Sequence, residues 1–158
     1  MSIFVKATLA PKPKTRESQI VAYIYAIILI ILVLCQLFTF DDFLLLLGGF
    51  GLPGGIMTAN MLGSIIVISE VFALPFLLGM WLSPLMRIIS MVLGWIVPLV
   101  WLKLSLWICL TSITAPNIGF LGTVIDLIPG WWTVFISIAL GLLAAWASWG
   151  MWPVKPKK

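Results

Sequence analysis

Four long apolar runs constrain this chain more than any other feature of its sequence. They cover residues 19–40, 56–80, 85–112 and 131–152. Each run meets or exceeds the roughly 20 residues that an α-helix needs to cross the hydrocarbon core of a bilayer, at a rise of about 1.5 Å per residue. A buried strand is never so long, and most core helices of soluble domains are shorter. The runs therefore predict an all-α membrane protein, built as a bundle of four transmembrane helices.

The composition excludes a water-soluble domain. Hydrophobic residues make up 63% of the 158 residues and charged residues only 9%, whereas a soluble domain averages about 25% charged residues. Most of the basic residues lie in two tails, residues 1–18 and 153–158, which flank a transmembrane domain at residues 19–152. Basic tails of this kind suit an anionic membrane surface. We therefore expect membrane lipids as partners and no nucleic acid.

The positions of lysine and arginine predict the orientation of the bundle. Both tails are basic, and so is the short turn that carries Arg87 between the second and third runs. An even number of crossings places these three segments on one side of the membrane, and the positive-inside rule makes that side the cytoplasm. The opposite loops carry Asp41, Asp42 and Asp126. We expect a multi-pass protein of the cell inner (plasma) membrane with both termini in the cytoplasm, and Arg87 as a determinant of this topology.

The two loops on the outer side are unusually apolar. Residues 41–55 read DDFLLLLGGFGLPGG, and residues 113–130 read ITAPNIGFLGTVIDLIPG. Both hold a greasy stretch that is too short to span, together with glycine and proline. Such segments are typical of short re-entrant or interfacial elements. We expect the two loops to cap the outer face of the bundle.

Glu70 is the clearest candidate for a functional residue. A carboxylate near the centre of a bilayer is costly, so such residues are functional candidates by default. At 100° per residue, Asn60, Gly63 and Ser64 fall on the same side of the second run as Glu70, which makes them candidates for a ligand site or a proton path. The alternative is that Glu70 is protonated or bonded to a neighbouring helix and serves packing alone. The sequence leaves both open.

Three further residues need the same weighing. Lys103 in the third run is a second candidate for a ligand site or proton path, although it lies near enough to the outer surface for its amine to snorkel there. Cys35 and Cys109 both fall within about 8 Å of the outer boundary and are a candidate disulfide. A buried free cysteine is also a common small apolar residue.

Catalytic motifs are missing from the sequence. It contains no histidine, which excludes haem ligation by histidine, histidine-based metal sites and a Ser-His-Asp triad within this chain. It also lacks a CxxC pair and a glycine-rich phosphate loop. We assign no catalytic residue and no metal site, and we expect any reaction that the protein serves to depend on a partner's active site.

Residues 38–94 carry a resemblance to a known family. The stretch FTFDDFLLLLGGFGLPGG, followed by SEVFALPFLLGMWLSPLMRIISMVLG, resembles the DoxX family and the related MauE-type, redox-associated membrane proteins. Those families show a Phe-rich loop that ends in GLP, then a helix with a glutamate, a leucine-glycine stretch, a short turn and an arginine. The matching positions are Gly51, Leu52, Pro53, Glu70, Leu77, Leu78, Gly79 and Arg87.

The resemblance implies four transmembrane helices with both termini inside and a role beside redox enzymes. It points to a non-catalytic subunit or assembly partner of a quinone-linked respiratory complex, with other membrane protein subunits as partners. No covalently bound cofactor is implied, and a quinone or lipid near Glu70 is the expected small molecule. Two alternatives stay open: a small transporter or channel-like protein that uses Glu70 and Lys103, and a purely structural accessory subunit of a larger membrane complex.

Overall fold

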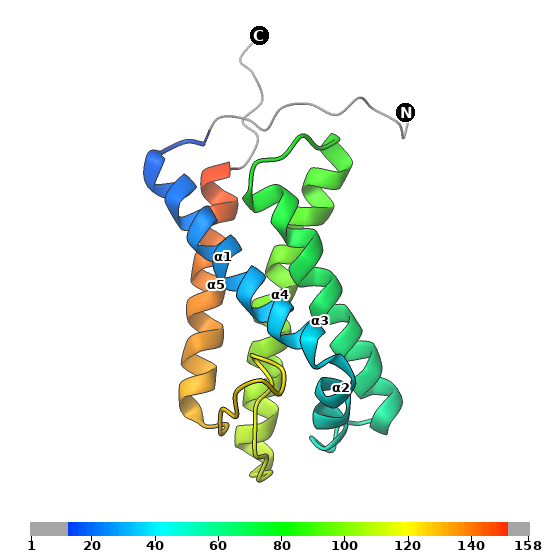
Figure 1. Ribbon diagram of the computed structural model, residues 1–158. Helices are drawn as coiled ribbons and strands as arrows, with labels where there is room; N and C mark the ends of the chain where they lie inside the picture. Colours follow the sequence, from blue (N-terminus) through cyan, green and yellow to red (C-terminus); the bar gives the residue numbers. More distant parts are fainter. Residues whose placement is uncertain (1–12, 152–158) are drawn as a thin grey trace.

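The computed structural model describes residues 13–151, which form five helices (Figure 1). In chain order these are α1 (Arg16–Phe38), α2 (Phe40–Gly48), α3 (Gly55–Leu77), α4 (Pro84–Thr111) and α5 (Trp131–Met151). All but α2 are long and apolar enough to cross a membrane. The predicted all-α bundle of four transmembrane helices is confirmed, and each helix boundary lies within three residues of the expected one. Trp152 and the tail residues 1–12 and 153–158 lie outside the described residues.

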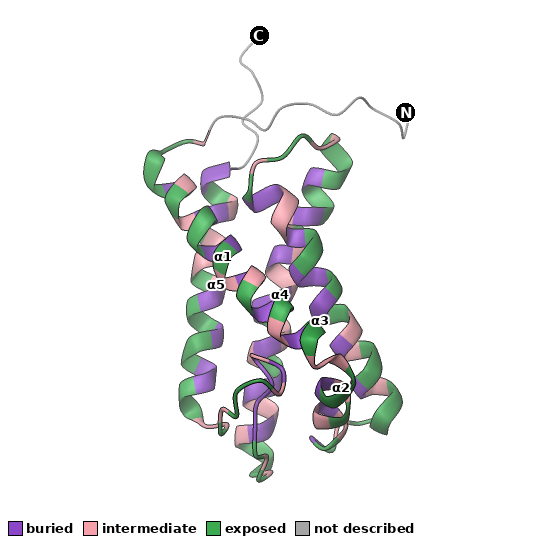
Figure 2. Ribbon diagram, viewed as in Figure 1, coloured by how far each residue is buried: buried purple, intermediate pink, exposed green. Residues whose placement is uncertain are grey.

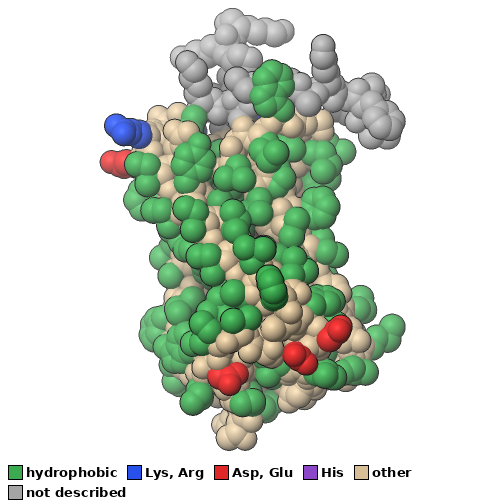
Figure 3. Space-filling model, viewed as in Figure 1, with side chains coloured by type: hydrophobic (Ala, Val, Ile, Leu, Met, Phe, Trp, Pro, Cys, Tyr) green, Lys and Arg blue, Asp and Glu red, His purple; other side chains and the backbone are tan. Residues whose placement is uncertain are grey.

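The four long helices form a closed ring. The helix α3 packs against both α1 and α4, and α5 packs against both α4 and α1. Buried side chains line the inside of this ring, while exposed ones cover its outside (Figure 2). Large apolar side chains such as Ile27, Phe135 and Leu142 are exposed there, and they cover the sides of the molecule (Figure 3). An apolar surface of this extent is solvated by lipid tails rather than by water.

Most of the charged residues that the structure describes lie at the two ends of the bundle, whereas Glu70 and Lys103 lie within helices. The N–H of Lys14 donates to the carbonyl of Gly150 at 3.0 Å, so the two ends of the described chain meet. The turn between α3 and α4, with Arg87 just after it, lies at the same end (Figure 1). We call it the basic end, defined by Lys14, Arg16 and Arg87. The opposite, acidic end carries Asp41, Asp42 and Asp126, and acidic side chains gather along that edge in Figure 3.

The first helix begins earlier than its apolar run. The hydroxyl of Thr15 accepts a hydrogen bond from the N–H of Ser18 at 3.2 Å. This is the N-cap interaction that satisfies one of the free donors at a helix start. The helix α1 therefore begins at Arg16 rather than at Gln19, and its first turn stands beyond the apolar run.

The end of α3 explains one of the residues that matched the family pattern. Gly79 has a φ of +66°, a left-handed conformation that side chains disfavour. The N–H of Met80 donates to the carbonyl of Pro75 at 3.0 Å, and the N–H of Gly79 donates to the carbonyl of Phe76 at 3.1 Å. These two bonds form a Schellman motif, which closes the helix and turns the chain. Gly79 thus has a structural role in the tight turn to α4.

The acidic end is covered first by α2. Part of the apolar stretch expected as a re-entrant or interfacial segment forms this short helix, which packs against α3. Its first turn carries Asp41 and Asp42, where negative charge is favoured by the helix dipole. Phe43 is fully buried. The missing side chain of Gly63 admits α2, because a Cβ there would lie 2.5 Å from Cδ2 of Leu44.

The second cover is the irregular segment 113–130, which we call the cap. In Figure 1 it runs back into the bundle beside α4 and α5 before the chain enters α5. Ile118 and Phe120 in the cap are buried. The burial of these two side chains confirms the expectation that this loop closes the bundle, and it shows that the cap reaches the core.

Candidate functional site

Glu70 lies in the second half of α3 with its side chain wholly inside the bundle, at 0% exposure. Its Oε1 accepts a hydrogen bond from Nε2 of Gln36 on α1 at 3.3 Å. The same oxygen accepts a long one, 3.5 Å, from Nε1 of Trp101 on α4. We call Gln36, Glu70 and Trp101 the glutamate cluster. One carboxyl oxygen therefore joins three transmembrane helices.

The glutamate cluster contains oxygens that no donor reaches. Among the described residues, Oε2 of Glu70 and Oε1 of Gln36 are buried without a hydrogen-bond partner, as is the hydroxyl of neighbouring Ser69. Buried polar atoms are nearly always paired, and an unpaired one costs about 1–3 kcal/mol. A cluster selected only to hold helices together gains nothing from such atoms. Their presence marks the cluster as the strongest candidate for a functional site.

The cap closes the cluster from the acidic end. Nε2 of Gln36 also donates to the backbone carbonyl of Phe120 at 3.0 Å. The ring of Phe120 packs on the indole of Trp101, with 4.5 Å between the ring centroids. Gln36, Glu70 and Trp101 are all fully buried, so the cluster has no surface open to lipid or bulk water in this conformation.

Asn117 holds the cap in shape. Its side-chain nitrogen donates to the carbonyls of Gly122 at 2.9 Å and Ile125 at 3.3 Å. Its side-chain oxygen accepts from the N–H groups of Gly119 at 2.9 Å and Leu127 at 3.3 Å. One buried amide thus satisfies backbone groups along most of the cap. The sequence analysis missed Asn117, although a lone asparagine between a proline and a glycine in an apolar loop is a signal for this role.

A second kind of polar contact in the core occurs next to Pro98 in α4. Proline lacks an N–H, so the carbonyl of Gly94, four residues earlier, loses its partner within the helix. The hydroxyl of Tyr25 on α1 donates to this carbonyl at 2.7 Å. Tyr25 is fully buried. Its hydroxyl replaces the missing backbone donor and ties α1 to α4.

Pro75 in α3 has a similar neighbour. The hydroxyl of Ser90 on α4 donates to the carbonyl of Phe72 at 2.5 Å and accepts from the N–H of Phe76 at 3.1 Å. It thereby bridges the helical turn that contains the proline, where the ladder of backbone bonds is disturbed. We call the contacts at Pro98 and Pro75 the proline sites. Both are explained by the packing of the helices against one another.

The residues that were expected on one polar side of the second run do not all lie together in the structure. Asn60 is exposed, and the hydroxyl of Ser64 donates to the carbonyl of Asn60 within α3 at 2.9 Å. Neither side chain forms a described contact with Glu70. Gly63 is buried, as is Glu70, and it faces α2. The neighbours of Glu70 are Gln36 and Trp101, which come from other helices and were not singled out from the sequence.

Lys103 is separated from Glu70 by the width of α4. Trp101 is fully buried in the glutamate cluster, and two residues along a helix correspond to a rotation of about 200°. Lys103 is accordingly exposed. It lines a groove of about 570 Å³, formed by residues 52, 53, 58 and 62 and by residues of α4 between 100 and 110. Cys35 and Cys109 are half-buried and are both free thiols.

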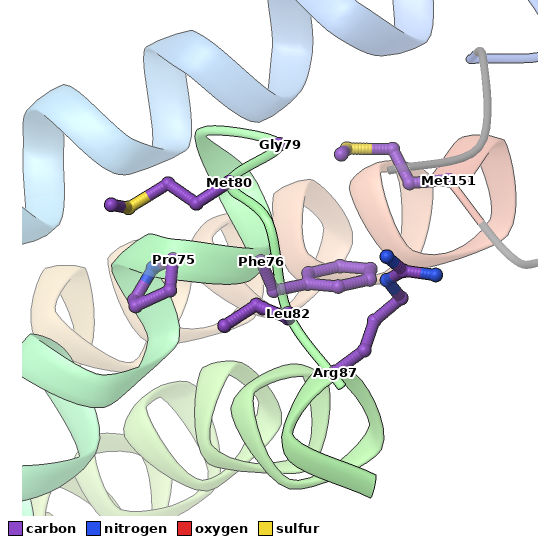
Figure 4. A pocket seen from close by; sticks show the side chains of 7 residues that line it. All are labelled: Pro75, Phe76, Gly79, Met80, Leu82, Arg87 and Met151. Atoms are coloured by element: carbon purple, nitrogen blue, oxygen red, sulfur yellow. The ribbon is translucent and has the colours of Figure 1, made fainter. Parts of the chain in front are cut away.

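Arg87 lies at the basic end and is 9% exposed. Figure 4 shows its side chain reaching from the start of α4 past the ring of Phe76 toward Met151 on α5. The cavity that these side chains line has a volume of about 10 Å³, which is room for one water molecule at most. This end of the bundle therefore offers a buried cation rather than a ligand pocket.

Known proteins supply no further assignment of the site. Within residues 13–151, no three His, Cys, Asp or Glu side chains are grouped so that they could hold a metal ion. Comparisons with family models, curated proteins and solved structures found no match to this chain. The candidate site is thus defined by its geometry, with Glu70 at its centre.

Proposed function

We propose that this chain is a non-catalytic membrane subunit or assembly partner of a quinone-linked redox complex in the inner (plasma) membrane. Glu70 is the residue through which it acts, by taking up and releasing a proton beside the redox chemistry of a partner subunit. The partner supplies the electron-transfer groups, because this chain has no histidine and no paired cysteine motif. The resemblance of residues 38–94 to redox-associated membrane proteins supports the class of partner.

The unpartnered oxygen of Glu70 carries this proposal. Oε1 is engaged by Gln36 and Trp101, whereas Oε2 has no donor or acceptor among the described residues. A charged carboxylate away from water is costly, so intramembrane carboxyl groups commonly mark proton relays. Oε2 accepts a proton without breaking either existing contact. The carboxyl group can therefore change its protonation state while the three helices stay joined.

Closure of the cluster supports an accessory role over an independent one. Glu70 is fully buried under the cap, so a proton or a quinone head group reaches it only when the cap or a helix moves. A partner subunit docked at the acidic end is well placed to cause such a movement. We expect a quinone or a lipid to approach the cluster in the assembled complex.

The transporter alternative receives less support. It needs Glu70 and Lys103 on one polar path, yet Lys103 faces the groove on the outside of α4 while Glu70 faces the core. No hydrogen bond or ion pair joins the two side chains in the described part of the chain. The purely structural alternative predicts that Glu70 is dispensable for turnover of the complex, which the experiments below decide.

The orientation proposed from the charges places the basic end in the cytoplasm. Single cysteines at Glu17 and at Val124, both exposed, test it in a background in which Cys35 and Cys109 are replaced by alanine. In intact cells an impermeant maleimide should label the cysteine at position 124 and spare the one at position 17. Labelling of position 17 in intact cells would reverse the topology.

Purification from native membranes tests the function itself. The tagged chain is extracted in a mild detergent, and the proteins that accompany it are identified by mass spectrometry. Haem, flavin or iron–sulfur subunits should co-purify in a constant ratio with the wild-type chain. Recovery of the chain alone, together with substrate flux when it is placed in liposomes, would reject the accessory role in favour of a transporter.

A further inference from the structure

The groove beside Lys103 is a site distinct from the glutamate cluster. One wall is the loop before α3 together with the first turns of α3, which contribute Leu52, Thr58 and Leu62. The other wall is the stretch of α4 from Val100 to Leu110. Apart from Lys103, Thr58 and the indole of Trp107, the lining is aliphatic. The groove opens on the outside of the ring, where the bundle meets lipid.

The shape of the groove suits a chain molecule. The stretch of α4 from Val100 to Leu110 extends about 15 Å along the bundle. The indole N–H of Trp107 donates to the carbonyl of Phe50 at 3.1 Å, which fixes the loop before α3 against α4. This hydrogen bond fixes the spacing of the two walls. The apolar floor between them is long enough to receive much of an acyl chain.

Lys103 places a positive charge in the half of the molecule that carries Asp41, Asp42 and Asp126. The other described lysine and arginine residues, namely Lys14, Arg16 and Arg87, lie at the basic end. The side chain of Lys103 is exposed, and the structure shows no hydrogen bond or ion pair to it from residues 13–151. An ammonium group within a transmembrane helix is costly unless it reaches the interface or meets an anion.

The level of Lys103 in the membrane brings its amine to the lipid head groups. The 28 residues of α4 extend about 42 Å, which exceeds a hydrocarbon core of about 30 Å. Lys103 precedes the end of α4 at Thr111 by about 12 Å of helix, so its flexible side chain extends to the boundary at the acidic end. That is the depth at which the phosphate groups of one leaflet lie.

We propose that this groove binds one phospholipid with an anionic head group. The phosphate group pairs with the ammonium of Lys103, and an acyl chain lies along α4 between Val100 and Leu110. The hydroxyl of Thr58 lies in the same lining and offers a second donor to the head group. The lipid fills the groove between α4 and the wall formed by α3 with its preceding loop, and so stabilises the end of the bundle that also carries the cap.

Photolabelling in vesicles tests this assignment. The full chain is reconstituted in phosphatidylcholine vesicles that contain phosphatidylglycerol with a diazirine in its acyl chain, and labelled peptides are mapped by mass spectrometry. Labels should concentrate on residues 52–62 and 100–110. Unlabelled phosphatidylglycerol should compete about fivefold better than phosphatidylcholine, which corresponds to one cation near a lipid surface.

Charge variants make the test specific. Lys103→Gln should remove the preference for phosphatidylglycerol in the groove, while Lys103→Arg should keep it. Arg16→Gln, which removes an exposed cation at the basic end, should leave labelling of the groove unchanged. Thermal melting followed by circular dichroism establishes that each variant is folded.

Two results would overturn the proposal. One is equal competition by the two lipids against the wild-type chain, which needs no variant and would leave an apolar groove without head-group selectivity. The other is an unchanged preference in Lys103→Gln. Either outcome leaves the proposed redox role of Glu70 untouched, since that role rests on a different set of residues.

Discussion

Next to Pro98 and Pro75, polar side chains form hydrogen bonds with backbone groups of the disturbed helices, whereas around Glu70 polar side chains leave oxygens without a donor. At the proline sites, the hydroxyl of Tyr25 serves the carbonyl of Gly94, and the hydroxyl of Ser90 bridges the turn around Pro75. In the glutamate cluster, Oε2 of Glu70 has no partner among the described residues.

The difference distinguishes polar side chains that serve the fold from polar side chains that are candidates for a function in the same core. A polar side chain that supplies a missing backbone donor gains stability and is explained by the fold alone. A carboxyl oxygen that is buried without a partner lowers stability, and its retention needs another reason. The following substitutions break or sharpen this comparison, from the largest expected effect on stability to the smallest.

Replacement of Asn117 should have the largest effect. Asn117→Ala removes the amide that serves four backbone groups of the cap. Leaving several of them without a partner should lower the free energy of unfolding by about 3 kcal/mol, given about 1–3 kcal/mol for each unsatisfied group. The measurement is unfolding in mixed detergent micelles, with fluorescence of the tryptophans as the signal. Asn117→Asp keeps an acceptor but places a second carboxylate against Oδ1 of Asp126, to which Nδ2 of Asn117 donates at 3.3 Å, so it should cost at least as much as Asn117→Ala.

The contact at Pro98 is tested by a double-mutant cycle. Tyr25→Phe leaves the carbonyl of Gly94 without a donor and should cost about 1–2 kcal/mol of unfolding free energy. In a Pro98→Ala background the helix regains an N–H for that carbonyl, so the same substitution should cost less than about 0.5 kcal/mol. Equal costs in the two backgrounds would show that the hydroxyl of Tyr25 does not replace the proline's missing donor.

Ser90→Ala should have a smaller effect. The hydroxyl of Ser90 bridges Phe72 and Phe76, but a backbone bond between these two residues can still form within α3. We expect a loss of about 0.5–1 kcal/mol, as measured for interhelical hydrogen bonds in membranes. A loss well above that range, measured in the same micelles, would mean that the turn around Pro75 depends on this hydroxyl.

Much of the fold could be predicted from the sequence because each long helix satisfies its own backbone in lipid. Length and hydropathy therefore locate the spans, and the remaining errors have local causes. The helix α1 begins at Arg16 because Thr15 caps it, and α2 forms because nine residues from Phe40 can bury Phe43 against α3.

The candidate site could be predicted only in part. Glu70 was found because a carboxylate within a span is rare. Its partners were missed because Gln36 and Trp101 lie 34 and 31 residues away, and periodicity along one helix does not reveal which face meets which neighbour. Asn60 was grouped with Glu70 by its angle around α3, yet it is exposed. Gln36, a polar residue near the end of an apolar run, was the available signal.

The most direct test of the proposed role of Glu70 is turnover of the parent complex purified with Glu70→Gln. The amide keeps the shape and the contacts to Gln36 and Trp101 but cannot exchange a proton, so the complex should assemble with normal composition and lose turnover by at least about tenfold. Glu70→Leu should in addition weaken helix association by about 1–2 kcal/mol. A complex that assembles and turns over normally with leucine at this position would contradict a functional role for Glu70.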